Sequence, residues 1–97
     1  MIRAFYDQGT EDFFNGVNSK EARKICPKKL WRIAVRKLEQ LDSAEMIDDL
    51  RVPPGNRLEA LKGDRLGQYS IRINDQYRIC FIWHMNGPDD VAIVDYH

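Results

Sequence analysis

The sequence has little cysteine and histidine, no long apolar run, and no excess of charge of either sign. Its two cysteines, Cys26 and Cys80, do not form the framework of a small disulfide-stabilised protein. Neither lies in a CxxC pair or at metal-binding spacing from a histidine, so we expect both to be buried thiols. No apolar run approaches the roughly 18 residues of a membrane span, and the first residues lack the apolar segment of a signal peptide. We therefore expect a cytoplasmic protein without a membrane partner.

The formal net charge is zero, because fifteen lysines and arginines balance fifteen aspartates and glutamates. This balance argues against a protein that coats nucleic acid through bulk positive charge. The charges are nevertheless unevenly distributed along the chain. Residues 20–37 hold eight basic residues and one acidic residue, residues 38–50 hold five acidic residues and no basic one, and residues 51–78 hold six basic and three acidic residues. The basic helix face is either an ordinary solvated surface or a stripe that contacts phosphates, and the sequence leaves both open.

The first half of the chain has helical patterns. Residues 2–6 are rich in β-formers and predict a short opening strand, followed by a turn over residues 7–10. Thr10 is the expected N-cap of a short helix that carries two phenylalanines. From Pro27 onward apolar residues recur with helical spacing, which predicts an amphipathic helix of about four turns that faces the core. Its stripe is Trp31, Ala34, Val35, Leu38 and Leu41.

The second half of the chain has the alternating pattern of strands, beginning after the Pro-Pro-Gly-Asn break at residues 53–56. It predicts strands over residues 58–62, 69–73, 77–83 and 91–94, with turns at 74–76 and 86–90. The last strand is apolar on both faces, so we expect it to be central. The chain, which has no repeat or linker, is expected to be one α+β domain over residues 1–97. Two N-terminal helices would pack on one face of a largely antiparallel sheet of four to five strands.

Several arginines are expected on the sheet face that the helices leave uncovered. Arg72 and Arg78 occupy strand positions whose neighbours on the opposite face are apolar. Three further cations, Arg57, Lys62 and Arg65, lie at strand ends or in loops close to them in sequence. Together they predict an anion-binding surface on the sheet, and we expect the cleft there to be locally positive. A cleft lined with acidic residues would contradict this expectation.

Four segments in this order resemble HigB-type toxins of the RelE superfamily of bacterial toxin–antitoxin systems. They are residues 57–65, which contain LKGDR; residues 67–72; residues 77–83, which begin with YRICF; and residues 94–97, which end in DYH. The resemblance covers nearly the whole chain and implies a RelE-like fold. It implies a toxin that enters the ribosomal A site and cleaves translated mRNA without a metal or another cofactor. It also implies a HigA-type helix-turn-helix antitoxin, with DNA contacted only through the toxin–antitoxin complex.

The resemblance also implies roles for individual residues. Lys62 would contact the scissile phosphate, and Arg78 would neutralise the charge that develops on it. Three residues at the end of the sequence would complete the catalytic cleft: Asp95, Tyr96 and His97. Three arginines would bind the substrate: Arg57, Arg65 and Arg72. Glu59 stands where some family members have histidine, which leaves one acid/base candidate as a carboxylate.

RNA cleavage without a metal uses the 2′-hydroxyl as nucleophile and needs a base, an acid and cations. His97 is suited to either proton transfer, because imidazole titrates near neutral pH. Glu59 or Asp95 could act as the base or orient His97, while Arg78 and Lys62 would supply the electrostatic stabilisation. Tyr96 could donate a hydrogen bond or stack on a base. The alternative is a weak or inactive RelE-like protein that acts by binding the antitoxin, the ribosome or the operator complex.

Overall fold

The computed structural model describes residues 1–96, so His97 lies outside the described residues. The three α-helices are α1 (Gln8–Asn15), α2 (Lys20–Arg23) and α3 (Trp31–Ser43). The four strands are β1 (Glu59–Ala60), β2 (Tyr69–Arg72), β3 (Tyr77–His84) and β4 (Gly87–Asp95). Short 3₁₀ turns lie between them, at Lys28–Leu30, Ile47–Arg51, Pro54–Asn56 and Gly63–Arg65.

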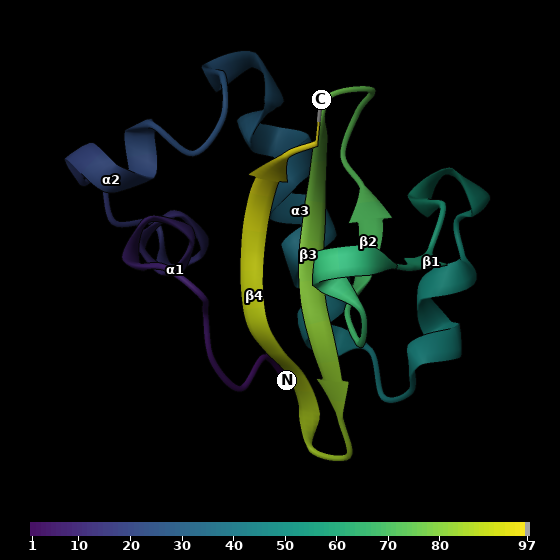
Figure 1. Ribbon diagram of the computed structural model, residues 1–97. Helices are drawn as coiled ribbons and strands as arrows, with labels where there is room; N and C mark the ends of the chain where they lie inside the picture. The colour runs from purple at the N-terminus through teal and green to yellow at the C-terminus, as the bar shows by residue number, and fades with distance from the viewer. Residues whose placement is uncertain (97) are drawn as a thin grey trace.

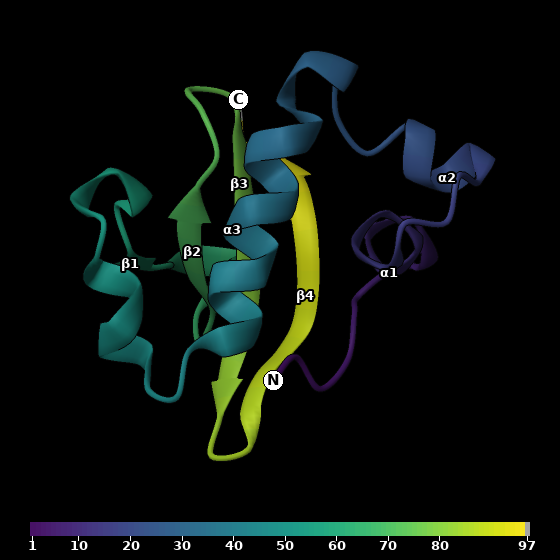
Figure 2. The ribbon, with the colours of Figure 1, turned by 180° about the vertical axis from the view of Figure 1, so that it is seen from behind.

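The sheet has the order β1-β2-β3-β4, and each neighbouring pair is antiparallel. Helix α3 lies across one face of the sheet (Figure 2), whereas the loop between β1 and β2 crosses the opposite face (Figure 1). We call that opposite face the open face. Helices α1 and α2 stand beside the outer edge of β4 in both views. The predicted α+β fold with an antiparallel sheet is confirmed, although a single long helix covers the sheet and two short helices lie beside it.

The core lies between α3 and the sheet, where the predicted apolar stripe is buried. Ala34, Leu38 and Leu41 have no exposed surface. They pack in one cluster with the apolar side of the sheet, which includes Ile71 and Phe81. Burying one such side chain contributes about 1.5–3 kcal/mol to folding. The alternation in β2 and β3 thus places apolar side chains under α3 and the intervening polar ones on the open face.

The segment between α3 and β1, residues 44–58, is held to the helix by a buried polar network. Asn56 is fully buried, and its amide nitrogen donates to the carbonyl of Leu50 at 3.1 Å and to Gln40 Oε1 at 3.2 Å. The ammonium group of Lys37 donates to the Asn56 side-chain oxygen. Burial lowers the pKa of Lys37, and the neighbouring Arg36 lowers it further. These bonds fix the path from α3 to β1, which positions the start of the sheet.

The beginning of the chain differs from the prediction. Asp7, rather than Thr10, caps α1, because its carboxylate accepts the backbone N–H of Thr10 at 2.7 Å. The helix therefore starts at Gln8, where a turn was predicted. Thr10 is buried, and its hydroxyl accepts the N–H of Ile93 at 3.4 Å. The predicted opening strand is reduced to a single parallel bridge between Phe5 and Val91.

The last strand is at the edge of the four-stranded sheet, so the prediction that it is central is wrong. Its outer edge is nevertheless covered. The segment before α1 lies along its outer edge, where Tyr6 donates a hydrogen bond to the Val91 carbonyl at 2.9 Å and Val91 donates to Ala4 at 3.2 Å. The strand also begins earlier than predicted, since Pro88 pairs with Trp83 in the ladder. The turn predicted over residues 86–90 is correspondingly shorter.

Candidate active site

Arg78 is held in a fixed position on the open face by hydrogen bonds to two residues, Ser70 and Arg57. Its Nε donates to Ser70 Oγ at 2.7 Å, and its Nη2 donates to the backbone carbonyl of Arg57 at 2.6 Å. Ser70 is fully buried, while the Arg78 side chain keeps 11% of its surface exposed. The β2–β3 register explains the first contact, because Ser70 pairs with Cys80 and Arg72 with Arg78 on the same face. Arg57 presents its carbonyl from a left-handed backbone conformation, with φ of 46°.

Two further side chains meet the Arg78 guanidinium. Glu59 Oε1 lies 3.6 Å from Arg78 Nη2, and this carboxylate is about half exposed, at 52%. The Tyr96 ring lies 5.8 Å from Arg78 Cζ, which is cation–π distance. Glu59 reaches this position because β1 pairs Glu59 with Ser70. Tyr96 reaches it because its backbone N–H donates to the carbonyl of Gln76, beside the turn between β2 and β3. Glu59, Arg78 and Tyr96 therefore come together from three separate segments.

The remaining predicted residues lie around this group. Asp95 accepts a hydrogen bond from Gln76 Nε2 at 3.1 Å. Arg72 forms an ion pair with Asp75 in the β2–β3 turn, and Arg65 Nη1 donates to Gln68 Oε1 at 3.3 Å. The side chains of Lys62 and Arg57 are exposed. His97, the predicted acid or base, lies outside the described residues.

A hollow of about 620 Å³ lies on the open face between the β1–β2 loop and β4. Its charged lining consists of one arginine and four aspartates: Arg65, Asp7, Asp64, Asp90 and Asp95. The prediction of a locally positive cleft is therefore wrong for this hollow. Positive charge close to the hollow comes from Arg65 in its lining and from Arg78, which is close enough to act on Cys80 in its wall.

Cys80 lies in the wall of the hollow, and charged side chains close to it act on the pKa of its thiol. Burial raises the pKa of the Cys80 thiol, while Arg65 and Arg78 oppose that rise and Glu59 adds to it. These three charged groups are therefore all close enough to act on Cys80. The thiol stays protonated at neutral pH and is a packing group, as the sequence predicted for both cysteines, which are free and buried.

The sequence is similar to that of known proteins. Residues 3–97 match a family described as the RelE-like toxin of the type II toxin–antitoxin system HigB. The chain belongs to this family of toxins. It is 40% identical over 96 residues to Toxin HigB-1 of Vibrio cholerae serotype O1, a match that covers 99% of this chain and 94% of the relative. It is also 42% identical over 67 residues to an uncharacterised protein of Haemophilus influenzae, covering 69% of this chain and 66% of that protein.

A solved structure supports the fold of this HigB-like toxin. A chain of the YoeB-YefM complex from Staphylococcus aureus matches it with a TM-score of 0.58 and 23% identity, over 100% of this chain and 98% of that one. At this identity the match speaks for the fold alone. Two further properties concern residues 1–96 only: no helix there is long and apolar enough to cross a membrane, and no group of three or more His, Cys, Asp or Glu side chains there could hold a metal ion.

Sequence reasoning missed two groups that shape the site of this toxin. Ser70 is a small polar residue between apolar ones, and its position opposite Cys80 becomes meaningful only with the strand register. Its place on the same face as Arg78 was readable from the alternation in β2 and β3. The carbonyl of Arg57 had no signal in the sequence, because it depends on a left-handed residue 21 positions before Arg78.

Proposed function

We propose that this HigB-like toxin is an endoribonuclease that cleaves mRNA in the A site of the translating ribosome. The observation that carries the proposal is the grouping of Glu59, Arg78 and Tyr96 on the open face. A fixed guanidinium beside an accessible carboxylate supplies a cation and a base, two of the three kinds of group that phosphodiester cleavage by an internal hydroxyl needs. The resemblance of residues 57–65 and 77–83 to RelE-type nucleases supports the same activity.

In the proposed reaction the ribose 2′-oxygen attacks the adjacent phosphorus, and the bond to the 5′-oxygen breaks. The products are a 2′,3′-cyclic phosphate and a free 5′-hydroxyl. Arg78 Nη1 donates to no atom of residues 1–96, so its two N–H groups are free to bind the non-bridging phosphate oxygens as charge develops. Loss of one such fixed donor typically reduces the rate about 10²- to 10³-fold. Lys62, exposed at the start of the Gly63–Arg65 turn, would add a second positive charge.

Two proton transfers complete the reaction. We assign the Glu59 carboxylate to the proton of the 2′-hydroxyl, because it is half exposed and adjacent to Arg78. We assign His97 to the leaving 5′-oxygen, with Asp95 as the group that orients it. Tyr96, 42% exposed, would stack on a base or donate a hydrogen bond to the substrate. Since aspartates line the hollow, the ribosome would supply much of the positioning of the negatively charged mRNA.

The partner proposed for this toxin is a HigA-type antitoxin with a helix-turn-helix domain, encoded beside it. Support comes from the family, which is defined by a toxin–antitoxin system, and from the similar fold in the YoeB-YefM complex. DNA would be contacted only through the toxin–antitoxin complex. A ribosomal substrate would require the toxin to act in the cytoplasm.

One observation favours the alternative of a binding protein with little catalytic activity. The Arg78 side chain is mostly buried. It already contacts Ser70, Arg57 and Glu59, as expected of an arginine whose role is to stabilise the fold. Expression without the antitoxin separates the two functions. The nuclease proposal predicts growth arrest that Arg78→Ala or His97→Ala relieves, while Lys24→Ala, a change of an exposed lysine away from the open face, does not relieve it. Arrest that is undiminished in both site variants would refute the assignment, and growth without arrest of the parent chain would favour the binding protein.

A further inference from the structure

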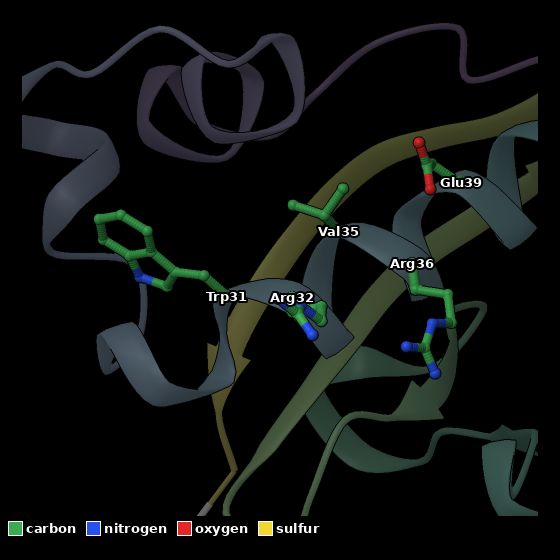
Figure 3. Close-up of a pocket in the computed structure, with 5 residues that line it drawn as sticks. All are labelled: Trp31, Arg32, Val35, Arg36 and Glu39. Carbon is green, nitrogen blue, oxygen red and sulfur yellow. The ribbon is translucent and has the colours of Figure 1, made fainter.

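The molecule has an apolar groove on the side of α3 that is remote from Arg78. One part of it, about 650 Å³ in volume, lies between α3 and the α1–α2 region. A second, shallower part of about 430 Å³ follows the outer side of α3 (Figure 3). Trp31 and Val35 line both parts, so the two form one continuous surface, which we call the α3 groove. It is separated from the open face by α3 and the sheet.

The floor of the α3 groove is mostly apolar. Trp31 donates its indole N–H to the carbonyl of Cys26 at 2.9 Å, and its ring meets Phe13 edge-on at 6.0 Å. Val17 also lines the groove and is half exposed. Burial raises the pKa of the Cys26 thiol to about 11, so this side chain is an uncharged part of the floor at neutral pH. Such a floor fits apolar side chains better than the hydrogen-bonding edges of bases.

The rim of the α3 groove is positively charged. Arg23 and Lys28 line one part, and Arg32 and Arg36 line the other. None of these four cations forms an ion pair with a carboxylate among residues 1–96. Among residues 1–96, Glu39 is the only acidic side chain in the lining, and it lies toward the C-terminal end of α3. Because residues four apart lie on one side of a helix, Trp31 and Val35 form an apolar row beside the basic row of Arg32 and Arg36.

We propose that the α3 groove is the docking site for an acidic amphipathic segment of the antitoxin. Its apolar side chains would cover Trp31, Val35 and Val17, and its carboxylates would meet Arg32 and Arg36. The inference rests on the proposed toxin–antitoxin pairing but not on the nuclease chemistry. A partner with both properties explains the apolar floor and the unpaired cations together, whereas RNA would account for the cations alone.

The test measures the affinity of the toxin for the protein encoded by the neighbouring gene, by titration calorimetry at a fixed salt concentration. Arg32→Glu combined with Arg36→Glu should weaken binding at least tenfold. A control with the same change in net charge, Lys24→Glu combined with Lys29→Glu, alters exposed lysines that do not line the groove and should weaken it less than threefold.

A second pair of variants tests the apolar floor. Val17→Lys adds a positive charge and removes an apolar contact, so it should also weaken binding about tenfold. Val52→Lys makes the same change at an exposed valine outside the groove and should change the affinity less than twofold. Each variant is first shown to unfold at the same urea concentration as the parent, so that a loss of affinity reports on docking.

Every outcome of this test decides the proposal. Unchanged affinity in both groove variants, or no complex with the neighbouring gene product, would overturn it. Loss of affinity on charge reversal with full affinity in Val17→Lys would also overturn it, because it would indicate a purely electrostatic contact. Loss of mRNA cleavage on charge reversal with unchanged antitoxin affinity would assign the groove to RNA. A toxin that binds through the groove but leaves mRNA intact would refute the nuclease proposal and leave the docking proposal standing.

Discussion

Replacing Ser70 with alanine removes the hydroxyl that fixes Arg78 and leaves the rest of the open face unchanged. The lost hydrogen bond is 2.7 Å long, and its acceptor is fully buried. Hydrogen bonds to charged groups contribute about 1.5–3 kcal/mol. Arg78 keeps its bond to the Arg57 carbonyl and its contact with Glu59, so we expect a loss near the middle of that range, about 2 kcal/mol in the free energy of unfolding.

The same substitution should reduce mRNA cleavage more than its effect on stability suggests. A guanidinium freed at Nε can shift by about 1 Å, and a misplacement of that size can cost about 10²-fold in rate. We expect a ten- to hundredfold lower single-turnover rate on translating ribosomes, with little change in ribosome affinity. Urea unfolding followed by tryptophan fluorescence measures the stability change, provided that the slope with urea is unchanged. Ser43→Ala, at the exposed end of α3, is the matched control and should stay within about 0.5 kcal/mol of the parent. A Ser70→Ala protein as stable and as active as the parent would refute the positioning of Arg78 by Ser70.

Three further predictions concern the core, the segment between α3 and β1, and the thiols. Leu38→Ala should cost about 2–5 kcal/mol of unfolding free energy because Leu38 is fully buried under α3, whereas Leu66→Ala, at an exposed position, should change it by less than about 0.5 kcal/mol. Asn56→Ala should cost about 3 kcal/mol because it leaves the Lys37 ammonium without its acceptor, and Asn56→Asp, which retains an acceptor, should cost less; equal losses would contradict this account. The Cys26 pKa is raised to about 11 in the folded chain from 9.0, so its thiol stabilises the fold fully below pH 9 and less as pH rises toward 11. Urea unfolding at pH 8 and pH 10 should therefore show a smaller decline in Cys26→Ala than in the parent, and identical declines would contradict the raised pKa.

The sequence predicted best the elements whose signal is local and repeated. The apolar stripe from Trp31 to Leu41 was sufficient to predict α3, because each of its turns contributes to the same buried face. The turn at residues 74–76 was also predicted correctly: Asn74 accepts hydrogen bonds from the backbone of Gln76 and Tyr77 with its own side chain. In both cases the residues that cause the structure are neighbours in the sequence.

The errors arose where a distant partner decides the structure. The β-formers of residues 2–6 make only one bridge, because the segment must leave β4 for α1 once Asp7 caps the helix. The predicted strand over residues 58–62 is reduced to Glu59–Ala60, because Arg57 takes a left-handed conformation before it and the Gly63–Arg65 turn follows it. The apolar pattern of the last strand predicted a central position, but β4 is at the edge of the sheet, and residues 4–6 cover that edge without forming a strand.

The candidate site was predictable as a set of residue types but not as a geometry. Strand alternation placed Arg72 and Arg78 on the open face, yet only Arg78 reaches Glu59 and Tyr96, because Asp75 pairs with Arg72. The acidic hollow was not foreseen, since its aspartates come from four separate places in the chain: the N-cap of α1, the β1–β2 loop, and two positions in β4. Long-range contacts of this kind depend on topology rather than on any local pattern.

The most direct test of the proposed function is a map of cleavage sites on mRNA bound to translating ribosomes, with purified parent toxin and Arg78→Ala. The account predicts cuts at the ribosomal A site with 5′-hydroxyl and 2′,3′-cyclic phosphate ends, at least 100-fold fewer cuts with Arg78→Ala, and no cuts in the same mRNA without ribosomes. Intact mRNA on ribosomes with the parent toxin, or equal cutting by parent and Arg78→Ala, would contradict it.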